Sequence, residues 1–244
     1  MSTVNGGWRG ANIVRDGLVL YLDAGSPNSY PLINSSTTWR DISGNGNNGV
    51  LTNGPIYNTA NGGNIVFDGS NDYASCISNN TTNLTGNFTL SAWININTLP
   101  TNGNLQSLLC KYDNFPGAGG YDLRIYNNSG TMQIGLVTTN GSSAGGGDIN
   151  YTFSTNIWYQ IVSVYDGSFS NIYINGQYVN RVTNTINAIS NNKPLNIARF
   201  GEYMGGLLTR YFNGRMAQTQ IYNRALSASE VLQNFNATRA RFGI

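Results

Sequence analysis

Apolar residues along the chain occur in short alternating runs that are separated by Gly, Asn and Pro. The runs are rich in Val, Ile, Tyr and Phe, which favours the strands of a β-sandwich or β-barrel over helices. We therefore expect strands over residues 17–24, 64–69, 88–96, 106–112, 121–127, 132–139, 157–167, 171–176, 177–182, 195–200 and 211–223.

The turn between two of these runs is specified closely by its sequence. Asn175-Gly176 lies between the two alternating halves of NIYINGQYVNRV, and Asn-Gly is the strongest short-range signal for a type I′ hairpin turn. Ile172, Ile174 and Tyr178 are separated by even numbers of residues, two and four. We expect these three side chains on the core face of the hairpin.

One helix is predicted near the C-terminus, in the stretch LSASEVLQNFNATR. Ser227 is followed three residues later by Glu230, the spacing of a capping box, and apolar residues then recur at helical spacing. The chain has no composition break and no internal repeat. We therefore expect one domain over 17–235, with an N-terminal arm at 1–16 and a C-terminal tail at 236–244.

Charged residues make up only 10% of the chain, and the net charge is +2. So weak a positive charge does not provide the electrostatic footprint of a nucleic-acid-binding protein, so we expect no nucleic-acid partner. The N-terminus has no apolar core of a secretory signal, and no apolar run is long enough to span a membrane. Cys76 and Cys110 are expected as buried free thiols, with a disulfide across neighbouring strands as the alternative.

The chain contains no histidine, which excludes Ser-His-Asp and Cys-His catalysis and removes the commonest metal ligand. The only glutamates are Glu202 and Glu230, and the second is expected to cap the helix. Asp68 and Asp72 are the only close pair of aspartates, but the turn residues between them favour turn capping over a glycosidase pair. We predict that the chain is not an enzyme.

The stretch RDISGNGNNG at 40–49 has the spacing of a calcium loop and of a dinucleotide fingerprint. Thr52 stands where an EF-hand needs a bidentate Glu, and no helix is predicted after the glycines, so both strict motifs fail. A turn capped by Asp41 remains the main interpretation. A looser calcium site that combines Asp41 with Asp68 or Asp72 stays open.

Tyrosine is abundant, with 15 copies, and the chain has four tryptophans. Aromatic faces beside amide side chains are typical of surfaces that bind neutral sugars. Trp93 and Trp158 lie inside apolar strands, so we expect them in the core. The candidates for sugar binding are Trp39, Tyr112, Tyr203 and Tyr211.

Six segments occur in a characteristic order: GLVLYLDAGSPNSYP, TWRDISGNGNNGVLTNGP, IVFDGSNDY, FTLSAWI, IYINGQYV and FNGRMAQTQIYNRALSASEV. Together they resemble the laminin-G-like, concanavalin A-like lectin/glucanase domains over residues 17–235. The resemblance implies a jelly-roll sandwich of two antiparallel sheets and a binding, adhesion or structural role, with sugar as a frequent ligand and calcium as a frequent structural ion. Calcium-holding members often carry an acid where this chain has Ala217 and Gln218, so we expect no cofactor.

The beginning GLVLYLDAGSPNSYP behind a short Gly-rich arm, together with the ending NATRARFG, also resembles virion proteins of tailed phages. We therefore expect a non-enzymatic protein on the virion surface, extracellular after release, whose partners are other virion proteins and copies of itself. The arms would anchor it, or be disordered tails. A carbohydrate-binding adhesion module for neutral cell-surface glycans is the alternative. The candidate anchoring residues are Trp8, Ile13, Val14, Arg239, Arg241 and Phe242.

Overall fold

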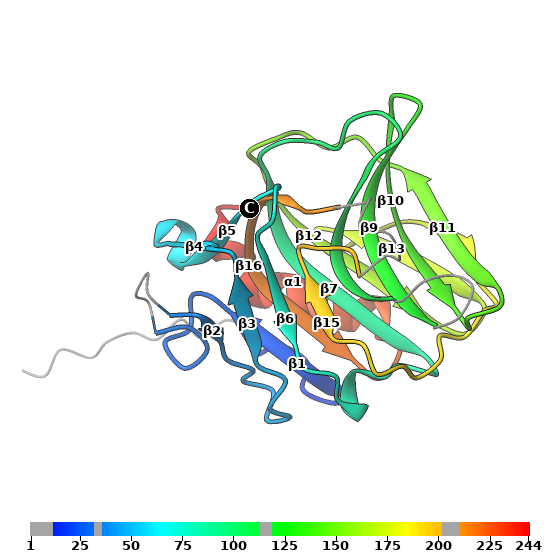
Figure 1. The fold of residues 1–244 in the computed structure, drawn as a ribbon, viewed down its shortest axis with the longest axis horizontal. Coiled ribbons are helices and arrows are strands. Elements are labelled where there is room, and N and C mark those ends of the chain that lie inside the picture. The colour runs from blue at the N-terminus through cyan, green and yellow to red at the C-terminus, as the bar shows by residue number, and fades with distance from the viewer. Residues whose placement is uncertain (1–11, 32–35, 113–118, 202–209) are drawn as a thin grey trace, which may run out of the picture.

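The chain folds into two antiparallel β-sheets that pack face to face, with a helix outside one of them (Figure 1). The structure is a computed structural model that describes residues 12–31, 36–112, 119–201 and 210–244. The predicted all-β jelly-roll sandwich with one short C-terminal helix is confirmed for these residues.

The first sheet, sheet A, has the strand order β14-β13-β12-β7-β16-β5-β4. β1 also belongs to it, because β1 pairs with the second half of β16 while β5 pairs with the first half. The strands are β1 (Leu18–Asp23), β4 (Ile56–Asn58), β5 (Asn64–Asp68), β7 (Phe88–Ile96), β12 (Trp158–Tyr165), β13 (Phe169–Ile174), β14 (Gln177–Thr183) and β16 (Asn213–Tyr222).

The second sheet, sheet B, has the strand order β11-β10-β9-β8-β15-β6-β3-β2. The sequence pattern missed four of its strands: β2, β3 and β6 at one end, which have two to four residues, and the seven-residue β11 at the other end. The strands are β2 (Thr38–Trp39), β3 (Gly49–Thr52), β6 (Tyr73–Cys76), β8 (Leu105–Tyr112), β9 (Gly120–Asn128), β10 (Thr131–Thr139), β11 (Ala144–Asn150) and β15 (Leu195–Ile197).

The main core lies between the two sheets and is built by alternate residues of each strand. In β7, Phe88 and Leu90 point into this core. The intervening Thr89 points outward, and its hydroxyl donates a hydrogen bond to the carbonyl of Arg224. This is the period-two pattern of a pleated strand. Every residue of β7 is nevertheless buried, so the outer side of sheet A is covered as well.

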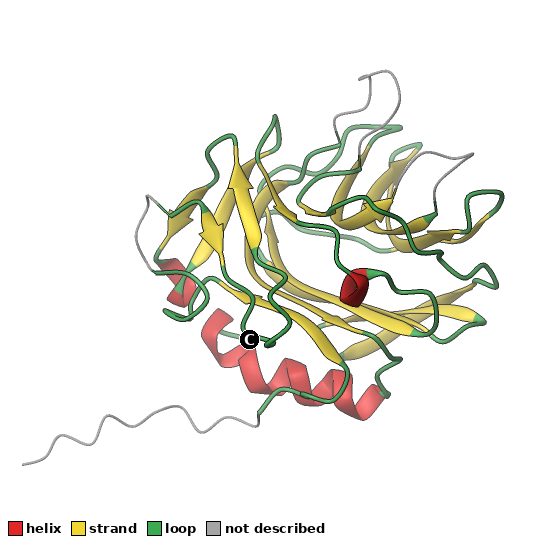
Figure 2. Cartoon of the chain, turned by 60° about the horizontal axis from the view of Figure 1, so that its bottom comes forward, coloured by secondary structure: helices red, strands yellow, loops and turns green. Residues whose placement is uncertain are grey.

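The cover on sheet A is a helical layer formed by α1 (Ala228–Thr238) and the short 3₁₀ helix η3 (Arg239–Phe242). Figure 2 shows α1 lying across the outside of the strands. Ser227 caps it through the predicted capping box with Glu230. Two further 3₁₀ turns, η1 (Ala60–Gly62) and η2 (Asn80–Thr82), lie in loops.

The hairpin of β13 and β14 confirms the predicted turn but corrects one side chain. Asn175 and Gly176 both have positive φ, 51° and 74°, as a type I′ turn requires. The two-residue turn pairs Ile174 with Gln177, so Tyr178 lies opposite Tyr173 on the outer side. Tyr178 is 52% exposed and not part of the core.

The N-terminal arm joins the fold earlier than the predicted boundary at 16. Ile13 and Val14 are each 8% exposed and pack against the helical layer. The Val14 amide donates to Asn234 Oδ1 at 2.8 Å, and its carbonyl accepts from the Tyr222 hydroxyl at 3.1 Å. This corrects the expectation that Ile13 and Val14 are free to enter a partner; Trp8 lies outside the described residues.

The C-terminal segment 236–244 is also part of the fold, where the sequence predicted a tail. Phe242 is buried and stacks on Trp93, with ring centroids 4.0 Å apart, and it also contacts Trp158. Phe242 is therefore not available as an anchor for a partner. Arg239 remains exposed, with its guanidinium 5.8 Å from the Phe235 ring.

Arg241 closes the C-terminal segment onto the rest of the domain. Its Nη1 donates to Asp23 Oδ1 at 2.6 Å, and its Nε donates to the Asn61 carbonyl at 2.6 Å. It also donates to the carbonyl of Gly63. The guanidinium is thus engaged within the molecule, which corrects its predicted role as an anchor.

The two cysteines are free and buried, as expected. Cys76 points into the core between the sheets, whereas Cys110 belongs to a small cluster on the outer side of sheet B. β15 also lies between their strands. No helix in the described ranges has the length and hydrophobicity to cross a membrane.

The first prediction tests whether the C-terminal segment is part of the core. Replacing Phe242 by Ala removes the ring between Trp93 and Trp158, and we expect a loss of about 3 kcal/mol in unfolding free energy. Urea unfolding followed by tryptophan fluorescence measures it. The control is Ile244→Ala at an exposed position, which should change stability by less than about 0.5 kcal/mol. Equal, small effects of both variants would show that the segment is a tail.

Candidate functional site

Partly exposed tyrosines and arginines gather on the outer face of sheet B, where β15 lies between β6 and β8. Tyr73 projects outward from β6 because its neighbour Ala74 points into the core. We call this surface the aromatic–arginine patch. Its residues are Tyr73, Tyr112, Arg199, Phe200, Arg210 and Tyr211.

The patch has two halves, each with aromatic rings beside a guanidinium. In the first half, Arg199 Cζ lies 4.3 Å from the Tyr73 ring centroid, and the rings of Tyr73 and Tyr211 are 6.4 Å apart. The second half has the Tyr112 and Phe200 rings 5.3 Å apart, with a further arginine, Arg210, beside Phe200. These distances are within the range of aromatic and cation–π contacts.

The backbone after β15 brings the two halves together. Arg199 forms an antiparallel bridge with Tyr211, and the Phe212 amide donates to the Ala198 carbonyl at 2.8 Å. Ala198 has a φ of 65°, a region that non-glycine residues seldom occupy. Before Ala198, Leu195 and Ile197 of β15 point into the core between the sheets. After it, Arg199 and Phe200 belong to the outer side of sheet B.

An ion network adjoins the patch on β9 and β11. Arg124 binds Asp148 through two hydrogen bonds, from Nε at 3.1 Å and from Nη2 at 2.8 Å. This is the bidentate geometry that makes arginine–carboxylate pairs specific. Its Nη1 lies 3.9 Å from Asp122 Oδ2. One arginine therefore lies between two carboxylates on the outer side of the sheet.

The ion pair crosses the intervening strand β10 above a glycine. Gly135 is paired with Arg124 on one side and with Asp148 on the other. A Cβ at this position would lie 2.6 Å from Asp148 Oδ1 and closer still to the Gly147 carbonyl oxygen. The absence of a side chain at Gly135 thus leaves the space in which Arg124 reaches Asp148.

Asp122 is the most deeply buried acid of this network, with no exposed surface. Its polar neighbours are the Ser107 hydroxyl and the Arg124 guanidinium. Burial raises the pKa of Asp122 to about 6, although the charge of Arg124 acts in the opposite direction. The network therefore contains a carboxyl group that gains a proton in mildly acidic solution.

Of the predicted sugar-binding residues, the structure brings two together. Tyr112 and Tyr211 are both partly exposed members of the aromatic–arginine patch. Trp39 is fully buried in the core between the sheets, so its prediction as a sugar-binding residue is wrong. Tyr203 lies outside the described residues. Trp93 and Trp158 are buried as predicted, but under the helical layer and not between the sheets.

The looser calcium site does not form from the three predicted aspartates. Asp41 accepts from the amides of Tyr21, Ser43 and Asn47, so its oxygens cap the 40–49 turn. Asp68 likewise accepts from amides of the 70–72 turn, and Asp72 accepts from the Asp68 amide. The described residues contain no cluster of three potential metal ligands, so Asp41 does not join the other two.

The sequence analysis missed the ion network and the arginines of the patch. The signal was present in YDLRIY, where Asp122, Arg124 and Tyr126 occupy alternate positions of a strand in a chain with few charges. Alternation places these three residues on one face. No local pattern marked Arg199 and Arg210. They lie near each other because the residues at 210–212 pair with the residues at 198–200 that follow β15.

Comparison with known families gives one match over most of the sandwich. Residues 68–232 match the family described as the concanavalin A-like lectin/glucanases superfamily. This stretch covers more than half of the chain and includes every strand of the aromatic–arginine patch. No curated protein was found that is similar in sequence.

Several solved structures share the fold. The binding domain of Paraclostridial Mosquitocidal Protein 1 has a TM-score of 0.66 and 22% identity, and covers 91% of this chain and 52% of that one. The receptor-binding domain of botulinum neurotoxin C/D mosaic serotype has a TM-score of 0.67, 16% identity and coverages of 91% and 51%. Trypanosoma rangeli sialidase, in complex with sialic acid, has a TM-score of 0.63 and 18% identity, and the match covers 92% of this chain and 33% of the sialidase. The chain thus spans a third to about half of these proteins, and the likeness shows the fold.

The buried acid gives the second prediction. Asp122 holds its proton more tightly in the folded protein than in the unfolded one, so its ionisation lowers stability as the pH rises through about 4 to 6. We expect Asp122→Asn to be more stable than the wild type by about 1–3 kcal/mol near pH 8 and to lose this advantage near pH 4. Urea unfolding at both pH values measures the difference.

The control for Asp122 is Asp166, whose pKa is shifted the other way. Desolvation of Asp166 is outweighed by the amides of Ser168 and Phe169, which hydrogen-bond its carboxylate and lower its pKa. Asp166→Asn should therefore lose stability near pH 8 relative to acidic pH. A pH-independent effect of Asp122→Asn would contradict the assignment of a raised pKa.

Proposed function

The chain belongs to the concanavalin A-like lectin/glucanase superfamily, and we propose that it is a non-enzymatic binding domain that recognises glycans through the aromatic–arginine patch. The observation that carries this proposal is the gathering of three partly exposed tyrosines with two arginines, which lie over the Tyr73 and Phe200 rings, on one side of sheet B. The helical layer covers the corresponding side of sheet A.

The chemistry of the patch fits a sugar ring. The C–H bonds on one side of a pyranose pack on the electron-rich face of a tyrosine, while its hydroxyls accept hydrogen bonds from arginine and donate to acceptors nearby. Tyr73 and Tyr211 supply such rings, and Tyr112 supplies another at the second half of the patch. Two half-sites, each with its own aromatic rings, favour an oligosaccharide over a single sugar.

We propose neutral glycans as the ligands of the patch, as expected from the sequence. Sialylated glycans are the class to compare them with. Solved structures with this fold include a botulinum neurotoxin D domain in complex with N-acetylneuraminic acid. That ligand is reported for a protein about twice as long as this chain. Both glycan classes therefore belong in the binding experiment.

The acids of the site support binding without hydrolysis. A glycosidase needs one carboxyl group to protonate the leaving oxygen and a second to act on the sugar. Asp122 has no exposed surface from which to reach a substrate. Asp148 is held by both of its oxygens in the Arg124 ion pair. Neither group is placed to exchange protons with a bound glycan.

A second proposal, carried by the resemblance of the chain ends, is that the domain is displayed on a phage virion. Other virion proteins and copies of the chain would be its partners, and the particle surface would be its location. Because Ile13, Val14 and Phe242 are buried in the domain, attachment would use other residues, with residues 1–11 as the leading candidates.

The third prediction concerns the patch. Tyr211→Ala removes a stacking face, and we expect it to weaken glycan binding about tenfold, or ~1.4 kcal/mol. A glycan array with neutral and sialylated ligands identifies the ligand, and isothermal titration calorimetry gives the Kd. Tyr178→Ala is the matched control, because Tyr178 is an exposed tyrosine on sheet A. Absence of saturable binding, or equal losses in both variants, would refute the proposal.

The fourth prediction tests display on a particle. Deletion of residues 1–11 should prevent incorporation into virions while the far-ultraviolet circular dichroism of the domain stays unchanged, since the described fold begins after them. Quantitative mass spectrometry of purified particles measures incorporation. Particles that carry the truncated chain at the full-length level would exclude anchoring by these residues.

A further inference from the structure

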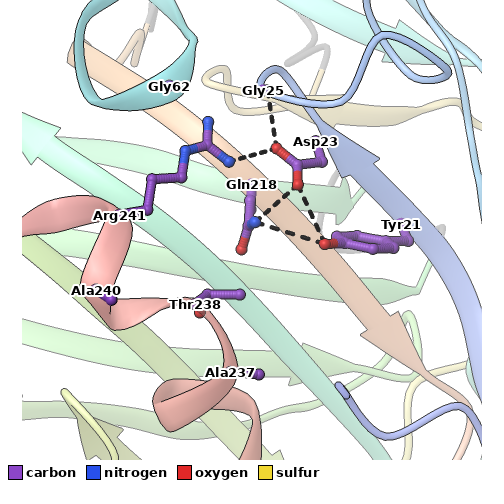
Figure 3. A pocket seen from close by; sticks show the side chains of 9 residues that line it. All are labelled: Tyr21, Asp23, Gly25, Gly62, Gln218, Ala237, Thr238, Ala240 and Arg241. Carbon is purple, nitrogen blue, oxygen red and sulfur yellow. Dashed lines mark hydrogen bonds and ion pairs between the residues drawn. The ribbon is translucent and has the colours of Figure 1, made fainter. Parts of the chain in front are cut away.

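A cleft of about 610 Å³ opens on the other side of the molecule, between the helical layer and sheet A (Figure 3). Its floor comes from β1 and β16, and its wall comes from the end of α1 and from η3. It is separate from the aromatic–arginine patch, which lies on sheet B. The lining residues are Tyr21, Asp23, Gly25, Gly62, Gln218, Ala237, Thr238, Ala240 and Arg241.

The carboxylate in this cleft is fully occupied by neighbours. Asp23 Oδ1 accepts from the Gly25 amide at 2.9 Å and from Arg241 Nη1 at 2.6 Å. Asp23 Oδ2 accepts from the Tyr21 hydroxyl at 3.2 Å and from Gln218 Nε2 at 2.8 Å. Arg241 balances the charge of Asp23, so the cleft does not need a cation to neutralise it.

Tyr21 adds no charge to the cleft. Burial raises the pKa of the Tyr21 phenol well above its usual value, and the neighbouring Asp23 raises it further. The hydroxyl therefore keeps its proton and donates a hydrogen bond to Asp23. The cleft as a whole is neutral, because its one carboxylate and its one guanidinium form a pair.

Gln218 presents an unpaired acceptor in the cleft. The side-chain nitrogen must face Asp23, since a carboxylate only accepts hydrogen bonds. This orientation turns the amide oxygen away from Asp23, and Figure 3 shows it on the side of Thr238. Gln218 is 3% exposed, and its Oε1 accepts no hydrogen bond within the described residues. A buried acceptor of this kind is destabilising unless a donor reaches it.

The other open groups of the cleft are donors and small apolar surfaces. A guanidinium has five N–H groups, and three bonds from Arg241 go to Asp23, Asn61 and Gly63. Thr238 is already engaged, because its Oγ1 accepts from Trp93 Nε1 and donates to a helix carbonyl. The methyl groups of the two alanines offer contact surface without polar atoms.

We propose that this cleft binds a neutral, hydroxyl-rich ligand, as a second site independent of the aromatic–arginine patch. A hydroxyl donates to Gln218 Oε1, and a neighbouring hydroxyl accepts from the remaining N–H groups of Arg241. A hydroxyl is the group that does both without bringing charge. A charged ligand would compete with the Asp23–Arg241 ion pair and leave one partner buried and unpaired.

The test uses the whole chain with D-glucose and D-galactose as probes, followed by nuclear magnetic resonance. We expect saturable shifts of the Gln218 side-chain amide and of the Trp93 indole, which is hydrogen-bonded to Thr238 at the cleft. Ala240→Leu fills the cleft from an exposed position, and should weaken binding about tenfold or more.

Two variants make the result specific. Ala228→Leu is the matched control, since Ala228 is also exposed on the helix but does not line the cleft. It should leave the shifts unchanged, and so should Tyr211→Ala, because its ring belongs to the patch on sheet B. Three results would overturn the proposal: no saturable shift with either sugar, equal binding by the two leucine variants, or only water on Gln218 Oε1 in sugar-soaked crystals.

Discussion

The structure depends on one constraint: sheet A carries large apolar side chains on both of its faces, including the outer one. Alternate residues of β7 and β12 enter the core between the sheets, and the residues between them, including Trp93 and Trp158, lie on the opposite face. An antiparallel sheet can leave its second face in water only if that face is polar. The aromatic rings on the outside of sheet A therefore require a cover, which α1 and η3 supply through Phe235 and Phe242.

This cover explains how the two ends of the chain are held. The same layer buries Val14 from the N-terminal side, and the Tyr222 hydroxyl joins it to β16. Arg241 fastens the last turn to Asp23 of β1. Phe242 of η3 packs on the rings of Trp93 and Trp158, and small residues and polar groups beside it line the cleft between Arg241 and Gln218.

Sheet B has the opposite character, and this difference locates the main candidate site. Its inner residues complete the core, whereas its outer residues include Arg124 and Asp148, which form an ion pair across Gly135. These groups need no apolar cover. The tyrosines Tyr73 and Tyr211 can therefore stay partly exposed beside them, which suits a surface that meets a sugar from solution.

The sequence by itself determined the local elements, because their signals are confined to a few neighbouring residues: the Asn175-Gly176 turn, the cap of the helix at Ser227, and the alternation that marks each strand. Only the tertiary structure decided which face each strand covers. Alternation with a period of two assigns a side chain to one of two faces but does not say what lies on each. Trp39 is thus in the core and Phe242 in the fold, while Tyr211 meets Arg199, because long-range packing joins segments whose proximity no local pattern records.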